Sequence, residues 1–394
     1  MANFDHLSNL IARMNREAGI VGSSIAVYKS GKCLYEAYDG YADLETKKPV
    51  APDTLFRIYS MTKVVAVTAA LMLFERGYFR LNDEVGQYLP YLKNPQVLKS
   101  DGRGNFSVEP AQNALTFRHL FSMSSGIISG NTGSECGKRY LDAINAFKEV
   151  NGMHTLSQYA QIIGNLPLAF EPGTHFRYGS SLDVLSAVVE KLSGKTLGQF
   201  FKDEIFDPLG MKDTFFRFPS PEHADRLCSM YRTTENGLVK VTDMDANYQP
   251  DAVFEAASGG LISSLSDFSK FAQALACGQY NGVKILGRKT IDLMARNQLC
   301  PEALLEFRRG LSSMPDGTSH LEGYGYGLGV RTLMDPVAAG SNSSVGEFGW
   351  YGMAGSLLLV DPKEELSAVY MMQLLPCQEN YTHNRLRNAI YAAL

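Results

Sequence analysis

The sequence predicts an α+β fold: one antiparallel sheet flanked by helices and built from both ends of the chain, with a mostly helical region between them. Two observations predict this. Strand-like runs bounded by turn residues lie near the start of the 394-residue chain and again near its end. Prolines and helical stretches dominate the region between them. We therefore expect residues 1–80 and 251–394 to form an α/β domain, and residues 81–250 to form an inserted, mostly helical domain.

Local patterns predict the elements of the N-terminal part. Apolar residues at helical spacing indicate a packed amphipathic helix over residues 3–18. Residues 24–43 are typical of a hairpin of two strands. A short extended run at residues 54–58 leads to Ser60, and the uniformly apolar stretch behind it predicts a buried helix that ends at Gly77.

The later elements follow from the same signals. The middle region contains helical stretches at residues 181–192 and 197–205, and a polar segment at residues 93–115 that favours a surface hairpin or loop. The C-terminal part returns to strands. We expect a strand to begin at residues 327–330, an antiparallel pair at residues 356–360 and 366–371, and a closing helix at residues 384–394.

Composition narrows the classes of function. A net charge of −4, a pI near 6.0 and the absence of a Lys/Arg-rich run argue against nucleic-acid binding. No apolar run approaches the roughly 20 residues that a membrane helix needs, and no secretory signal is visible at the N-terminus. The six cysteines and seven histidines are scattered, without CxxC or HExxH spacing. We expect a cytoplasmic protein with reduced thiols and no metal or cofactor; composition leaves its oligomeric state open.

The chemistry centres on Ser60 and Lys63, at the start of the predicted buried helix. A serine hydroxyl needs a neighbouring base to act as a nucleophile. A spacing of three residues in a helix puts both side chains on one face. Burial and the positive end of the helix dipole both favour a neutral lysine, which can accept a proton. The spacing alone is weak evidence, since it arises by chance about once in a chain of this size. Ser60 as a helix cap and Lys63 as a solvated side chain would explain it equally well.

The surrounding segments resemble the serine β-lactamase-like superfamily, closest to the family VIII carboxylesterases and related transesterases, which resemble class C β-lactamases. The resemblance covers most of the chain and implies a β-lactamase/transpeptidase-like fold. It rests on several ordered motifs, at residues 53–63 (DTLFRIYSMTK), 115–126 (LTFRHL to SSG), 171–180 (EPGTHFRYGS), 207–211 (DPLGM), 258–261 (SGGL) and 326–329 (YGLG).

The resemblance also implies roles for single residues. Ser60 is the expected nucleophile, with Lys63 and Tyr178 as its catalytic partners. Tyr178 faces Ser60 across a cleft, where a charged Lys63 would favour its phenolate form. Which of the two takes the first proton stays open, since the pair titrates together. The backbone N–H groups of Ser60 and Met353 are the expected donors to the oxyanion.

The last motif points away from β-lactams. In the superfamily it is usually Lys-Thr-Gly or a variant, whereas this chain has Trp350, Tyr351 and Gly352. A lysine there would help to bind a carboxylate, and tryptophan offers only one N–H donor and an apolar face. Serine, as Ser180, replaces an asparagine that is usual in penicillin-recognising relatives. We expect these four residues to line the substrate pocket and to favour uncharged acyl groups.

The leading hypothesis is a serine hydrolase that cleaves carboxylic esters through an acyl-enzyme on Ser60. Its expected partner is a small-molecule ester or amide. Three alternatives remain at this point. The protein could be a β-lactamase or D-amino-acid peptidase, an acyltransferase that uses an alcohol acceptor, or a catalytically silent binding protein on the same fold. The Ser60, Lys63 and Tyr178 set argues against the last of these.

Overall fold

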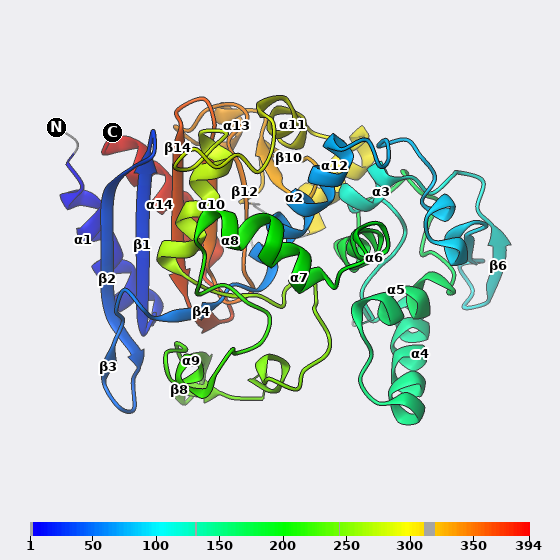
Figure 1. Cartoon of the computed structure of the whole chain (residues 1–394), viewed down its shortest axis with the longest axis horizontal. Helices are drawn as coiled ribbons and strands as arrows, with labels where there is room; N and C mark the ends of the chain where they lie inside the picture. Colours follow the sequence, from blue (N-terminus) through cyan, green and yellow to red (C-terminus); the bar gives the residue numbers. More distant parts are fainter. Residues whose placement is uncertain (1–2, 131, 244, 311–319) are drawn as a thin grey trace.

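An eight-stranded antiparallel sheet forms the centre of the computed structural model, which describes residues 3–130, 132–243, 245–310 and 320–394. Helices cover both faces of the sheet, and both termini lie at the same end of the molecule (Figure 1). The prediction of an α+β fold with a sheet built from both ends of the chain is therefore confirmed. The strand order is β10 (Tyr324–Tyr326), β11 (Arg331–Leu333), β12 (Phe348–Tyr351), β13 (Leu357–Asp361), β14 (Leu366–Met372), β1 (Gly22–Lys29), β2 (Lys32–Asp43) and β3 (Lys48–Pro49).

Alternating side chains give the sheet two apolar faces. In β1, Ile25 and Val27 point to one face and Ala26 to the other; in β14, Tyr370 and Val369 divide in the same way. This follows from the two-residue period of a strand. One face packs against α1 (Asp5–Ala18) and α14 (Glu379–Ala392), and the other against α10 (Leu265–Ala276) and α2 (Thr62–Glu75). The N-terminal hairpin, the strand pair near the C-terminus and both terminal helices are thereby confirmed.

The remaining elements are mostly helical and lie largely between residues 81 and 310. The additional strands form small sheets or hairpins: β4 (Leu55–Arg57) with β9 (Ile262–Ser264), β5 (Gln96–Ser100) with β6 (Phe106–Pro110), and β7 (Met230–Thr234) between β8 (Gly237–Val241) and β15 (Leu374–Leu375). The helices of four or more residues are α3 (Phe117–Phe121), α4 (Glu135–Asn151), α5 (Leu156–Gly164), α6 (Ser181–Ser193), α7 (Leu197–Phe201), α9 (Pro221–Asp225), α11 (Arg288–Met294), α12 (Pro301–Gly310) and α13 (Pro336–Ala339), with a π-helical turn at Lys202–Phe206 and α8 at Asp207–Leu209.

Helix α2 joins the sheet to the helical region. Every residue of α2 from Thr62 to Leu73 is buried, as its uniformly apolar sequence predicts. It packs against β12 of the sheet on one side and against α6 and α7 on the other, and Figure 1 shows it between the sheet and the helices. The proposed domain limits at residues 81 and 250 stay a prediction, because α2 packs into a single core with both parts.

The expectation of a strand at residues 327–330 is wrong. These residues form the turn between β10 and β11, closed by a hydrogen bond from Gly327 N–H to the Val330 carbonyl at 2.7 Å. Gly329 has a φ of +74°, which favours glycine. A Cβ atom on Gly329 would lie 2.3 Å from the side chain of Val67 in α2. The glycines mark a tight turn that packs closely on α2, rather than the start of a strand.

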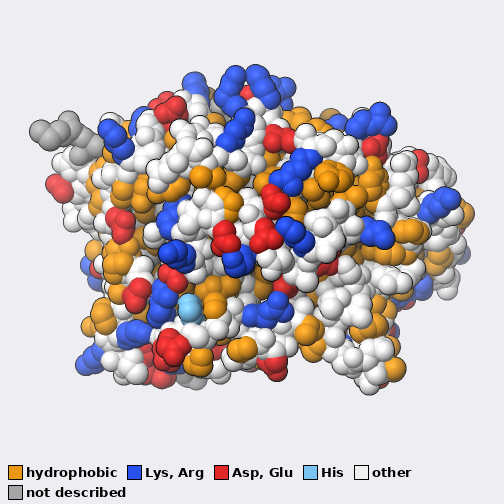
Figure 2. All heavy atoms as spheres, in the orientation of Figure 1, with side chains coloured by type: hydrophobic (Ala, Val, Ile, Leu, Met, Phe, Trp, Pro, Cys, Tyr) orange, Lys and Arg blue, Asp and Glu red, His pale blue; other side chains and the backbone are white. Residues whose placement is uncertain are grey.

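On the face of the molecule shown in Figure 2, Lys and Arg side chains are interspersed with Asp and Glu side chains. Within the part of the chain that the structure describes, no helix combines the length and the apolar character needed to span a membrane.

A buried ion cluster fixes the start of β12, the strand that carries Trp350. The Glu347 carboxylate is fully buried and pairs with Arg331 at 3.0 Å and Arg387 at 3.5 Å, each only 3% exposed. It also accepts a hydrogen bond from the Tyr324 hydroxyl at 3.1 Å. Although burial raises the pKa of Glu347, the two guanidinium groups hold it below its usual value. The cluster therefore ties β10, β11 and α14 to β12.

Replacing Glu347 by Gln should lower the free energy of unfolding by about 3 kcal/mol or more, because it leaves two buried guanidinium groups without a counter-charge. Denaturant titration measures the change. Glu364→Gln is the control, since its pair with Lys29 is partly exposed to solvent and should contribute less than about 1 kcal/mol. Equal effects of the two variants would contradict this role for Glu347.

Candidate active site

Ser60 lies at the junction of a strand and a helix. Strand β4 ends at Arg57, a 3₁₀ turn spans Tyr59–Met61, and α2 begins at Thr62. Tyr59 adopts a φ of +43°, which is uncommon for a non-glycine residue. This turn leaves the Ser60 N–H without a backbone acceptor among the described residues. Ser60 thus presents both a hydroxyl and an available N–H donor at the start of a buried helix.

Lys63 lies beside Ser60, in the first turn of α2. Its Nζ donates a hydrogen bond to Ser60 Oγ at 3.1 Å and another to the carbonyl of Ser258. Nζ also lies 4.5 Å from the centre of the Tyr178 ring. Only 2% of Lys63 is exposed. The structure therefore brings together the three residues expected to be catalytic, with the lysine over the face of the tyrosine ring.

Asp183 is a charged group near this cluster that the sequence reasoning missed. It lies in α6 and is 1% exposed, and its Oδ1 accepts a hydrogen bond from the Ser258 N–H at 3.0 Å. Burial raises the pKa of Asp183, while the charge of Lys63 and the backbone N–H groups of Ala257 and Ser258 oppose that rise. The sequence alone does not single it out, because α6 also carries the carboxylate of Glu190.

The hydroxyl of Tyr178 is held by tryptophan rather than by lysine. The indole Nε1 of Trp350 donates to the Tyr178 hydroxyl at 2.9 Å, and the two rings stack at 5.4 Å between centroids. Trp350 is 1% exposed and also contacts the rings of Tyr351 and Tyr326. Sequence reasoning expected Trp350 to line the pocket. In the structure its N–H instead supports the phenol oxygen of Tyr178.

The end of β12 lies against the turn that carries Ser60. A Cβ atom on Gly352 would lie 2.7 Å from the carbonyl oxygen of Ile58, so only glycine fits this approach. The next residue, Met353, is 42% exposed, and its N–H has no backbone acceptor among the described residues. The imidazole of His383 hydrogen-bonds the Gly355 carbonyl at 3.1 Å, in the turn that follows. Met353 is therefore held next to the Ser60 turn with a free N–H.

Two further pocket residues are engaged by neighbouring side chains. Ser180 is buried, and its hydroxyl shares a hydrogen bond of 2.7 Å with the Tyr159 hydroxyl. Tyr351 packs behind Trp350, against the ring of His383 at 5.5 Å. Both residues lie next to members of the Ser60 cluster, and their contact with a substrate stays a prediction.

Comparison with known proteins identifies the family. The family model described as Beta-lactamase matches residues 7–392. The chain belongs to this family. One similar protein is the esterase EstB of Burkholderia gladioli, 28% identical over 373 residues, which cover 90% of this chain and 86% of EstB. The family membership and this relative support an enzyme of the serine acyl-transfer type, without fixing its substrate.

Solved structures of the same fold extend over nearly the whole chain. EstCE1, described as a hydrolase with promiscuous acyltransferase activity, has a TM-score of 0.78 and 25% identity, and the match covers 98% of this chain and 97% of EstCE1. Simvastatin synthase LovD from Aspergillus terreus has a TM-score of 0.83 at 22% identity, covering 100% and 99% of the two chains. The predicted β-lactamase/transpeptidase-like fold is thereby confirmed.

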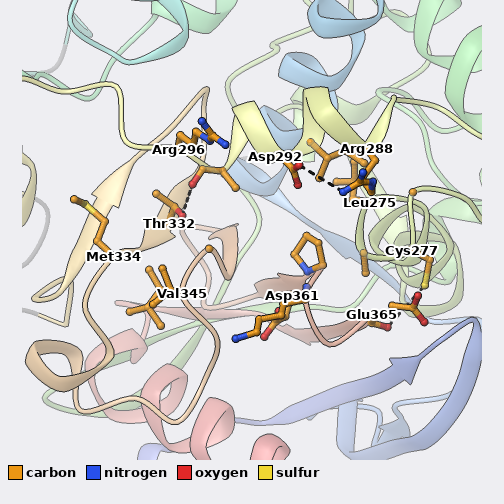
Figure 3. Close-up of a pocket in the computed structure, with 18 of the residues that line it drawn as sticks. Leu275, Cys277, Arg288, Asp292, Arg296, Thr332, Met334, Val345, Asp361 and Glu365 are labelled. Carbon is orange, nitrogen blue, oxygen red and sulfur yellow. Dashed lines mark hydrogen bonds and ion pairs between the residues drawn. The ribbon is translucent and has the colours of Figure 1, made fainter.

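A separate cavity of about 670 Å³ lies between α10, α11 and the sheet, away from the Ser60 cluster (Figure 3). It is lined by charged residues of both signs, such as Arg288 and Asp292, which pair at 4.0 Å. Its Cys277 thiol is a poor nucleophile, because burial and the nearby Glu365 raise its pKa. Ser60, Lys63, Tyr178 and Trp350 do not line this cavity.

Trp350→Phe should lower kcat/KM for a simple ester about tenfold or more and move the acidic limb of its pH profile to higher pH. The change keeps an aromatic ring but removes the N–H that supports the Tyr178 oxygen, and a hydrogen bond to a charged group contributes about 1.5–3 kcal/mol. Hydrolysis of p-nitrophenyl butyrate across pH measures both effects.

Tyr326→Phe is the matched control for this prediction. Tyr326 contacts the same indole ring at 5.3 Å, but its buried hydroxyl has no hydrogen-bond partner in the described residues. Its removal should leave the profile in place. A Trp350→Phe profile that coincides with that of the folded control would contradict the role given to the indole N–H.

Proposed function

We propose that this protein is a carboxylesterase that forms an acyl-enzyme on Ser60. The observation that carries the proposal is the hydrogen bond of 3.1 Å between Lys63 Nζ and Ser60 Oγ at the start of a buried helix. Nucleophilic serines need such a partner. The neighbouring Tyr178 supplies a second titratable group, and the N–H groups of Ser60 and Met353 supply two candidate oxyanion donors.

In the proposed reaction, Ser60 Oγ attacks the carbonyl carbon of the ester while its proton passes to the Lys63–Tyr178 pair. The two backbone N–H groups stabilise the oxyanion of the tetrahedral intermediate. The bond to the alcohol oxygen then breaks, and the alcohol leaves with the proton from the pair. A water molecule then gives a proton to the same pair and attacks the acyl carbon. The bond between the acyl carbon and Ser60 Oγ breaks, the pair returns the proton to Ser60 Oγ, and the carboxylic acid leaves.

The site chemistry favours esters of uncharged acids. Trp350 occupies the place on β12 where a lysine would serve a carboxylate, and its single N–H is already bonded to Tyr178. The exposed side chain of Met353 adds apolar surface beside the Ser60 turn. Ester cleavage itself is supported by the relatives EstB, an esterase, and EstCE1, described as a hydrolase.

Purified protein should hydrolyse p-nitrophenyl butyrate faster than nitrocefin, compared as kcat/KM. Ser60→Ala should lower the ester rate about 10³-fold or more, because the acyl-enzyme can no longer form. Ser107→Ala on the exposed strand β6 is the control and should be unchanged. An ester rate no greater than the nitrocefin rate would favour a β-lactamase or peptidase instead, and an active Ser60→Ala variant would refute the mechanism.

Acyl transfer to an alcohol is the second candidate function. It is supported by the promiscuous acyltransferase activity described for EstCE1. A second relative, 25% identical over 362 residues, is the monacolin J acid methylbutanoyltransferase of Aspergillus terreus. Adding 1-propanol to the ester assay separates the two functions. An esterase gives mainly butyric acid, whereas a transferase gives mainly propyl butyrate, and the product ratio decides between them.

A further inference from the structure

The backbone of Ser258 links two buried ionisable side chains, Asp183 and Lys63. Its N–H donates to Asp183 Oδ1 at 3.0 Å, and the carbonyl of the same residue accepts a hydrogen bond from Lys63 Nζ. Asp183 comes from α6 and Lys63 from α2, and these two helices pack against each other. The Asp183 carboxyl group and the Lys63 amino group are therefore both hydrogen-bonded to the backbone of one loop residue.

Both charged groups lie out of reach of water. Lys63 is 2% exposed and Asp183 is 1% exposed. An isolated buried ammonium is costly unless it is paired or deprotonated. The charge of Lys63 lowers the pKa of the Asp183 carboxyl, against the larger rise that burial causes. The uncharged titratable groups that face this pair are Tyr178, under Lys63, and Tyr159 of α5, beside Asp183.

We propose that Asp183 is a positioning residue: its carboxylate balances the buried charge of Lys63 and holds the Ser258 carbonyl against the ammonium. The inference rests on the proposed function, since it assigns Asp183 a part in the same site. An ammonium has no lone pair, so Lys63 in this form orients Ser60 and favours the phenolate of Tyr178 without taking the Ser60 proton itself. Asp183 thereby keeps Lys63 in its ammonium form, so that Tyr178 rather than Lys63 accepts the Ser60 proton.

The sign of the pH effect follows from this arrangement. A negative charge near a lysine keeps it protonated to higher pH, and its removal lets the lysine lose its proton at lower pH. Asp183→Asn keeps an oxygen that can accept from the Ser258 N–H, so the loop retains its hydrogen bond. The variant should move the alkaline limb of the kcat/KM profile to lower pH by about one unit or more.

Asp267→Asn is the matched control. Asp267 lies in α10, is 4% exposed and also accepts a backbone N–H, from Asp213 at 2.6 Å, but it has no contact with the Ser60 cluster. Its replacement should leave the alkaline limb in place, whatever it costs in stability. The proposal would be overturned if the alkaline limb of the kcat/KM profile did not move in Asp183→Asn. It would also be overturned if the acidic limb moved to lower pH instead.

A double-mutant cycle in thermal stability tests the pairing of Asp183 with Lys63 and needs no activity assay. Lys63→Met and Asp183→Asn each leave one buried charge unmatched, so the double variant should lose less in Tm than the two single losses added together. If Asp183→Asn does not fold, a double variant that folds gives the same answer. Additive losses, or a double variant that also fails to fold, would overturn the pairing.

The pH profiles and the stability cycle together distinguish a failure of this inference from a failure of the proposed function. A wild-type protein that turns over no ester refutes the esterase proposal, and the stability cycle then decides the charge pairing alone. An active wild-type protein with additive stability losses and an unmoved alkaline limb keeps the esterase and removes Asp183 from it.

Discussion

An ammonium group buried in a protein must find its counter-charge and its hydrogen-bond acceptors inside the fold, and the site of this protein is arranged around that requirement at Lys63. Its Nζ meets Ser60 Oγ, the Ser258 carbonyl and the face of the Tyr178 ring, while Asp183 supplies the opposite charge behind the Ser258 peptide. Because these partners come from separate segments, the charge of one side chain ties together α2, α6 and the loop before β9.

The sheet contributes through close contact of backbones. Gly352, at the end of β12, approaches the Ile58 carbonyl so closely that a side chain would not fit, and this places the Met353 N–H beside the Ser60 turn. The same strand carries Trp350, whose indole supports the Tyr178 oxygen. The buried cluster around Glu347 fixes the start of that strand. Packing far from the reacting atoms thus sets the geometry of both proposed oxyanion donors and of the tyrosine.

Local sequence patterns were sufficient to predict several helices and strands of the fold. The uniformly apolar run after Ser60 predicted the buried helix α2, and two apolar runs on either side of a turn at residues 361–365 predicted the paired strands β13 and β14. Prediction from the sequence failed where contacts between distant segments determine the local structure. Residues 327–330 form a turn because Gly329 packs against Val67, and no pattern along the chain shows that neighbour. Asp183 was missed for the same reason, since its partners Lys63 and Ser258 lie 120 and 75 positions away in the numbering. Motif resemblance brought Tyr178 to Ser60, but not the bond from Trp350.

The central claim, that Ser60 is the nucleophile of this site, is tested most directly by peptide mass mapping after treatment with a fluorophosphonate probe. Such a probe bonds covalently to a serine that a neighbouring base has activated. The account predicts one adduct, on the peptide that contains Ser60, at a rate that falls sharply when Lys63 is replaced by Met. The absence of an adduct on folded protein, or an adduct on another serine, would contradict it.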